Sequence, residues 1–206
     1  MKALKIIIQV IVISMGVLAL IGWFLPREVS LERSISIDAS PQKIYDVTKD
    51  FRQMYNWSPW HKIDPDGTQY EFEGPDGEVG MKMSWESEHE KVGKGSQEII
   101  ELEESELVKT EMYFEGFDAP SYASFIIKEE NGSSNVTWTY EGDLGPNPYM
   151  HYFGLMMESM LGPSYEEGLA DLKTYVEGLP EEIEHAEMTI ESDSTMMGID
   201  SVSVDL

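Results

Sequence analysis

An uncharged apolar stretch near the start of the chain predicts a membrane-spanning helix. Residues 6–25 carry no charged side chain, and about 20 residues rising ~1.5 Å each cross ~30 Å of hydrocarbon. Trp23 lies where an interfacial aromatic anchor is expected, and Pro26 ends the helix. A cleaved signal peptide is the alternative, but its apolar core spans only ~7–15 residues before a small-residue cleavage site, which LIGWFLPREV lacks. We therefore predict an anchor over residues 1–26.

The orientation of this anchor follows from the charges on its two sides. Lys2 and Lys5 precede the apolar stretch, while Arg27 and Arg33 follow it. Positive residues are retained on the cytoplasmic side, and the acidic sequence after the anchor offers no positive block. We expect a single-pass membrane protein with a cytoplasmic N-terminus and an extracytoplasmic domain.

Alternation with a period of two begins after Pro26 and predicts a half-buried strand over residues 29–38, in which Arg33 is the one charged residue on the apolar side. Ser40 and Pro41 then form a helix cap and first-turn proline, so a short helix runs to about Asp50. A second short helix and a loop are expected in FRQMYNWSPWHKIDPDG.

Six further strands are predicted between residues 68 and 142, separated by turn signals. They are Thr68–Glu73, Val79–Glu86, Ser96–Glu103, Leu107–Phe114, Tyr122–Glu129 and Asn135–Glu141. The loops between them are too short for parallel crossovers, so the seven strands should form one antiparallel sheet.

The apolar spacing changes to three and four residues after Pro148, which predicts a long amphipathic helix that ends at Gly178 and Pro180. Gly162-Pro163 predicts a kink or a brief break within it. The sequence therefore divides into the anchor, an α+β domain over residues 27–180, and residues 181–206. We expect the last segment to be a solvated acidic tail, with an extra strand or the start of a further domain as the alternatives.

Composition excludes several classes of function. The formal net charge of −25 opposes binding to nucleic acid, whereas a basic protein partner remains open. The chain has no cysteine and its four histidines are scattered, so neither a metal site nor a cofactor is predicted.

Several segments resemble the START-like (SRPBCC, polyketide cyclase/dehydrase-like) superfamily, in a membrane-anchored form. The likeness rests on RSISIDASPQKIYDVTKDFRQMYNWSPW, GEVGMKMSWES, VGKGSQEI, VTWTYEGDL and PYMHYFGLMMESMLGPSYEEGLADLKTYVE, and covers Arg27 to Leu179. The resemblance implies a helix-grip fold, in which a curved sheet wraps a long C-terminal helix around a cavity. The resemblance also implies binding of a hydrophobic small molecule or lipid in that cavity. It indicates the fold far better than any particular activity.

Aromatic and methionine side chains are the candidates for lining that cavity, although the same residues could form an ordinary core. They are Trp57, Trp60, Met81, Met83, Trp85, Phe114, Trp138, Tyr140, Phe153, Met156, Met157 and Met160. For an acid or base the sequence offers only His61, Tyr140 and His151, with no sign that they converge, so no catalytic residue is predicted. A polyketide-cyclase-type enzyme and a non-catalytic envelope or signalling module are the alternatives to ligand binding.

Overall fold

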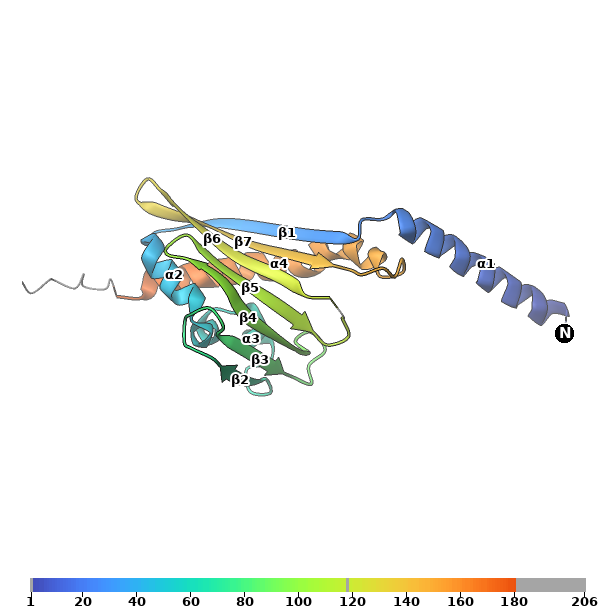
Figure 1. Ribbon diagram of the computed structural model, residues 1–206, viewed down its shortest axis with the longest axis horizontal. Coiled ribbons are helices and arrows are strands. Elements are labelled where there is room, and N and C mark those ends of the chain that lie inside the picture. Colours follow the sequence, from blue (N-terminus) through green and yellow to red (C-terminus); the bar gives the residue numbers. More distant parts are fainter. Residues whose placement is uncertain (1, 118, 181–206) are drawn as a thin grey trace, which may run out of the picture.

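The computed structural model describes residues 2–117 and 119–180 (Figure 1). The predicted acidic tail, residues 181–206, lies outside the described residues. The first element, α1 (Lys2–Phe24), projects from one end of the molecule (Figure 1). Its most apolar window has a mean hydropathy of 2.6 and none of it is buried against the rest of the chain. Its length and composition fit a membrane span and equally a signal sequence.

A seven-stranded antiparallel sheet forms the body of the protein, as the sequence predicts. The strands are β1 (Glu28–Ile37), β2 (Gln69–Glu73), β3 (Lys82–Glu86), β4 (Lys94–Glu103), β5 (Leu107–Phe114), β6 (Ser121–Glu130) and β7 (Ser133–Asp143). Their order is β1-β7-β6-β5-β4-β3-β2. Strands β2 to β7 thus form a meander, and β1 pairs with its last strand.

The largest difference between a predicted and an observed strand boundary is at the start of β3. The segment predicted to start at Val79 starts at Lys82, because Gly80 adopts a φ of +93° and turns the chain just before the strand. Only glycine adopts such a backbone conformation readily. Val79 therefore falls outside the strand and is 55% exposed, whereas Met81 is fully buried.

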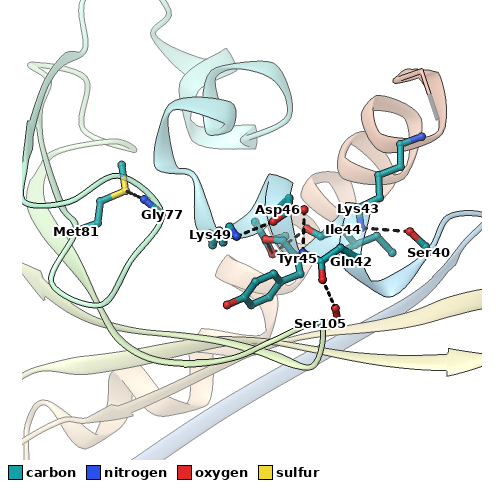
Figure 2. A network of polar contacts seen from close by, with 11 residues as sticks. Ser40, Gln42, Lys43, Ile44, Tyr45, Asp46, Lys49, Gly77, Met81 and Ser105 are labelled. Atoms are coloured by element: carbon teal, nitrogen blue, oxygen red, sulfur yellow. Dashed lines mark hydrogen bonds and ion pairs between the residues drawn. The ribbon is translucent and has the colours of Figure 1, made fainter. Parts of the chain in front are cut away.

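Three short helices connect β1 to β2: α2 (Pro41–Lys49), the 3₁₀ helix η1 (Phe51–Asn56) and α3 (Pro59–Ile63). Figure 2 shows how α2 is fixed. Its cap residue Ser40 accepts a hydrogen bond from the Lys43 amide, and Gln42 accepts one from the Ser105 hydroxyl in the β4–β5 turn. The helix is therefore held both at its N-terminus and against the sheet.

The last element, α4 (His151–Gly178), is one continuous helix, so the brief break predicted at Gly162-Pro163 does not occur. A proline removes one backbone hydrogen bond, and packing on both sides of it compensates. Gly162 lies under the guanidinium of Arg33, and Tyr165 is 2% exposed. The helix runs along β1 beneath the sheet (Figure 1), which confirms the predicted α+β helix-grip fold.

Arg33, the charged residue on the apolar side of β1, has partners on α4. Its guanidinium forms ion pairs with Glu158 and with Glu166, the latter at 2.8 Å. The Arg33 side chain is 24% exposed, so the paired charge lies at the rim of the core. Arg33 thereby fixes α4 along the edge strand.

Candidate functional site

The long helix α4 has a closed half and an open half. In the carboxyl half, Tyr165, Leu169, Leu172 and Val176 are at most 2% exposed. In the amino half, three apolar side chains that the sequence assigns to the cavity are uncovered: Phe153 is 42%, Met156 53% and Met160 52% exposed. We call these three residues the open stripe. The exposed residues lie on another side of the helix from the buried ones, since Met160 precedes Leu169 by nine residues, which is two and a half turns at 3.6 residues per turn.

The elements η1 and α3 cover the closed half. Lys62 of α3 forms an ion pair with Asp171, and the Tyr175 hydroxyl accepts a hydrogen bond from Asn56 at 3.0 Å. Phe153 precedes Asp171 by eighteen residues, which is five turns at 3.6 residues per turn, so the two share one face of the helix. The face that α3 covers in the carboxyl half is therefore the face that stays uncovered around Phe153.

An aromatic cluster fills the space between the sheet and the closed half. The ring of Trp138 on β7 lies 4.2 Å from that of Tyr165, 4.8 Å from that of Phe125 and 5.7 Å from those of Trp57 and Trp60. Within the described residues, the buried side-chain polar atoms without a hydrogen-bond partner are the indole nitrogens of Trp57 and Trp138. Both rings belong to edge-to-face pairs. This half is a filled core.

On the sheet side, a neutral polar pair lies near the open half. The hydroxyls of Tyr140 on β7 and Ser121 on β6 are 2.9 Å apart. Tyr140 is half-buried, and burial raises the pKa of its phenol above the ordinary 10.0. The phenol therefore stays protonated near neutral pH, and it can donate a hydrogen bond but cannot act as a base.

Phe114 and Trp85 extend the same face of the sheet toward β3. Their rings meet edge-to-face with centroids 5.7 Å apart. Gly95 lies between them on β4, and a Cβ there would come within 2.4 Å of the Trp85 ring. The absence of a side chain at Gly95 lets the two rings meet across the intervening strand, so the apolar surface is continuous.

The predicted cavity residues thus fall into three groups. Trp57, Met81, Met83 and Trp138 are buried, Trp60, Trp85, Phe114, Tyr140 and Met157 are half-buried, and Phe153, Met156 and Met160 are exposed. The two buried methionines pack with Phe51 and Ile99 in a core cluster of their own, apart from that of Trp138. The structure therefore does not bring the twelve residues around one space.

The three candidates for acid–base chemistry lie in separate contacts. The Nδ1 and Nε2 atoms of His151 lie 2.8 and 2.9 Å from the carbonyl oxygens of Gly22 and Gly145. His61 Nδ1 lies 3.4 Å from the hydroxyl of Tyr70 on β2. Neither imidazole shares a contact with Tyr140, so no acid–base pair is assembled. The described residues also contain no group of three metal-binding side chains.

Two open grooves flank the junction of β1 and α4. One, of about 210 Å³, is lined by Val29, His151, Gly154, Leu155 and Met157 among others, and the second, of about 410 Å³, by Leu31, Arg33, Tyr140 and Glu158 among others. Three of these groove residues were not predicted from the sequence: Val29, Arg33 and Leu155. The position of Arg33 in the alternating strand was the available signal, whereas nothing local distinguishes Leu155.

Comparison with known proteins gives the same assignment as the fold. A family model described as polyketide cyclase / dehydrase and lipid transport matches residues 28–177. No curated protein matches the chain significantly.

Solved structures with low sequence identity share the fold. A Thermobifida fusca protein is 18% identical with a TM-score of 0.54, covering 71% of this chain and 92% of its own. A Chromobacterium violaceum protein is 18% identical with a TM-score of 0.50, covering 76% and 100%. The di-domain ARO/CYC StfQ from the steffimycin biosynthetic pathway is 9% identical with a TM-score of 0.54, covering 73% and 51%. The match over β1 to α4, together with the seven-stranded grip, shows that this chain belongs to the polyketide cyclase/dehydrase and lipid transport family.

Proposed function

We propose that the chain is a membrane-anchored protein that binds a hydrophobic small molecule or lipid at the open half of its grip. The observation that carries this proposal is the uncovered apolar stripe of α4, where Phe153, Met156 and Met160 are 42–53% exposed. A soluble surface rarely retains a contiguous run of such side chains unless something binds there. Family membership supports the same class of function.

The anchoring part of the proposal is supported by α1. This helix has 23 residues, and none of its most apolar window is buried by the rest of the protein. Exposing that much apolar surface to water is unfavourable at roughly 25 cal/mol per Å², whereas a bilayer buries it. We propose that the helix is retained and that the domain is extracytoplasmic, because acidic residues dominate the sequence after Pro26.

The chemistry of the open half suits a mostly apolar ligand with a single polar end. Met156, Met160 and Phe153 offer an adaptable apolar wall, because the thioether chain is flexible and polarizable. Tyr140 and Ser121 offer neutral hydroxyls at the rim. Glu158 lines both grooves, which disfavours an anionic ligand. A neutral lipid or another neutral apolar molecule with a carbonyl or hydroxyl group fits best.

An enzyme of the polyketide-cyclase type is supported less well. Tyr140 lines the second groove, and the raised pKa of its phenol makes it a hydrogen-bond donor. Donation suits recognition of a ligand oxygen, whereas proton abstraction requires a base with a pKa near the working pH. Binding without catalysis is therefore the simpler function.

A non-catalytic interaction module is the second candidate, and the filled aromatic cluster favours it. Trp57 and Trp138 are 1% and 4% exposed, so a ligand entering the closed half has to displace packed rings. In this case the acidic surface would hold a basic protein partner.

Native mass spectrometry of the full chain, purified from its host's membranes in detergent, tests the binding proposal. We expect a reproducible apolar adduct, which Met160→Glu abolishes because a carboxylate is placed in the apolar stripe. Ser159→Glu is the matched control, since it adds the same charge at a neighbouring exposed position. A chain that carries no adduct in either form, and takes up no added phosphatidylcholine, would refute ligand binding and favour the interaction module.

A further inference from the structure

The start of α4 and the loop before it lie alongside α1. The Tyr149 hydroxyl donates to the carbonyl oxygen of Met15 at 3.0 Å, and the Tyr152 hydroxyl donates to that of Leu18 at 2.8 Å. His151 Nδ1 lies 2.8 Å from the carbonyl oxygen of Gly22. The loop and α1 occupy the same end of the molecule in Figure 1. The domain is thus joined to α1 by side chains as well as by the chain itself.

These contacts reach well into the apolar helix. Met15 precedes Leu25 by ten residues, which is about 15 Å at 1.5 Å per residue, or half of the ~30 Å hydrocarbon core. Both tyrosine hydroxyls are satisfied by helix carbonyls, which have a second lone pair to accept them. Their phenol groups can therefore lie at membrane depth without an unpaired donor.

The contact between α1 and the loop is close. A Cβ on Gly22 would come within 2.2 Å of the Pro148 carbonyl oxygen, nearer than non-bonded atoms approach. A Cβ added at Gly16, six residues earlier on α1, would have no atom within 4 Å. Gly22 therefore allows the backbones to approach, and the loop is held at a defined height along α1.

The surface around this loop lacks the charge found elsewhere. The chain has 39 acidic residues, yet residues 144–157 contain no Asp, Glu, Lys or Arg. Glu158 is the first charge after them, and it is paired with Arg33. The exposed side chains here are apolar or aromatic: Tyr149 is 42% and Leu155 64% exposed, and the open stripe continues them.

We propose that residues 144–160 form a second membrane-contacting element, which lies in the bilayer surface beside α1 and turns the open stripe toward lipid. Apolar and aromatic side chains with few charges are what an interfacial element presents to a membrane. Because this segment contributes no Lys or Arg, the surface that it fits is one of neutral lipids such as phosphatidylcholine. A ligand could then pass from the bilayer to the open half without crossing water. The inference rests on the anchoring part of the proposed function.

Single cysteines test this placement in the full chain, which has none of its own. Phe153→Cys and Met156→Cys are labelled with an environment-sensitive fluorophore and reconstituted into phosphatidylcholine vesicles with and without doxyl-labelled lipid. Ile8→Cys in α1 is the membrane reference, and Glu167→Cys, exposed on the same helix α4, is the water reference. We expect labels at 153 and 156 to lose most of their fluorescence to the doxyl lipid, as at 8, while the label at 167 keeps its intensity.

Three other results would overturn the inference in distinguishable ways. If the labels at 153 and 156 behave like that at 167 while the label at 8 is quenched, α1 is in the membrane and the second element is not. If their emission shifts to the blue without quenching by doxyl lipid, protein covers the stripe, as in contact with a second copy of the chain. If the label at 8 is not quenched either, the anchoring proposal itself fails.

Discussion

The close approach of α4 to the sheet predicts that Gly168→Ala destabilises the domain. A Cβ at this position would lie 2.7 Å from Cζ3 of Trp138 and 3.0 Å from Cδ of Pro59, whereas carbon atoms pack best at about 3.5–4.0 Å. The Trp138 ring is held between Phe125 and Tyr165, so it cannot move away freely. Overpacking of this kind costs ~1–3 kcal/mol, and the better helix propensity of alanine returns at most ~1 kcal/mol.

The matched control is Gly178→Ala, where nothing lies within 4 Å of the added Cβ. We expect Gly168→Ala to be less stable than this control by ~1–3 kcal/mol, read from urea unfolding of the full chain in detergent by tryptophan fluorescence. In thermal unfolding each kcal/mol corresponds to a shift of about 2–4 °C for a protein of this size. If Gly168→Ala is as stable as Gly178→Ala, the helix does not approach the aromatic cluster as described, and the assignment of a closed half is wrong.

Three further changes test separate contacts. The backbone amide of Asp38 donates a hydrogen bond to the Glu177 carboxylate and lowers the pKa of that carboxyl below its ordinary 4.5. The stability that this contact contributes is therefore present above pH 4.5 and is lost as the pH falls through the lowered pKa. Glu177→Gln should remove that part of the acid sensitivity, measured by urea midpoints from pH about 6 to about 3. Gly22→Leu should push α1 from the loop at 144–150 and speed amide exchange there, whereas Gly16→Leu should leave it unchanged; equal exchange in both variants would contradict the contact. Ser121→Ala should cost about 1 kcal/mol, because it removes the partner of the half-buried Tyr140 hydroxyl, and an unchanged urea midpoint would show that water replaces it.

The fold could be read from the sequence because its signals are local. Alternation in residues 29–38, turn residues between short strands, and three- and four-residue spacing after Pro148 each report the face that a segment buries. The loops between the strands are too short for parallel crossovers, so the strands form an antiparallel meander. The largest boundary error, at Val79, depends on a glycine with positive φ, whose backbone angle the apolar pattern does not encode.

The site was harder to predict because it depends on what lies opposite each apolar face. The three- and four-residue spacing grouped Phe153, Met160 and Leu169 as apolar positions of one amphipathic helix. Their exposures differ, at 42%, 52% and 2%, because Leu169 packs in the core cluster, whereas Met160 is two and a half turns away and points to the opposite side of the helix. Cover of this kind is a non-local property, and no pattern within the helix reports it.

The sequence by itself determined an apolar N-terminal helix, an antiparallel sheet gripping a long helix, and an acidic surface without metal-binding motifs. Those features follow from the order of residue types along the chain, which decides secondary structure and which face is apolar. Only the tertiary structure decided that the grip is filled at one end and open at the other. It also decided that Arg33 pairs with Glu158 and that Tyr149 reaches α1. Each of these contacts joins residues more than a hundred positions apart, and their distance is set by packing of the whole domain.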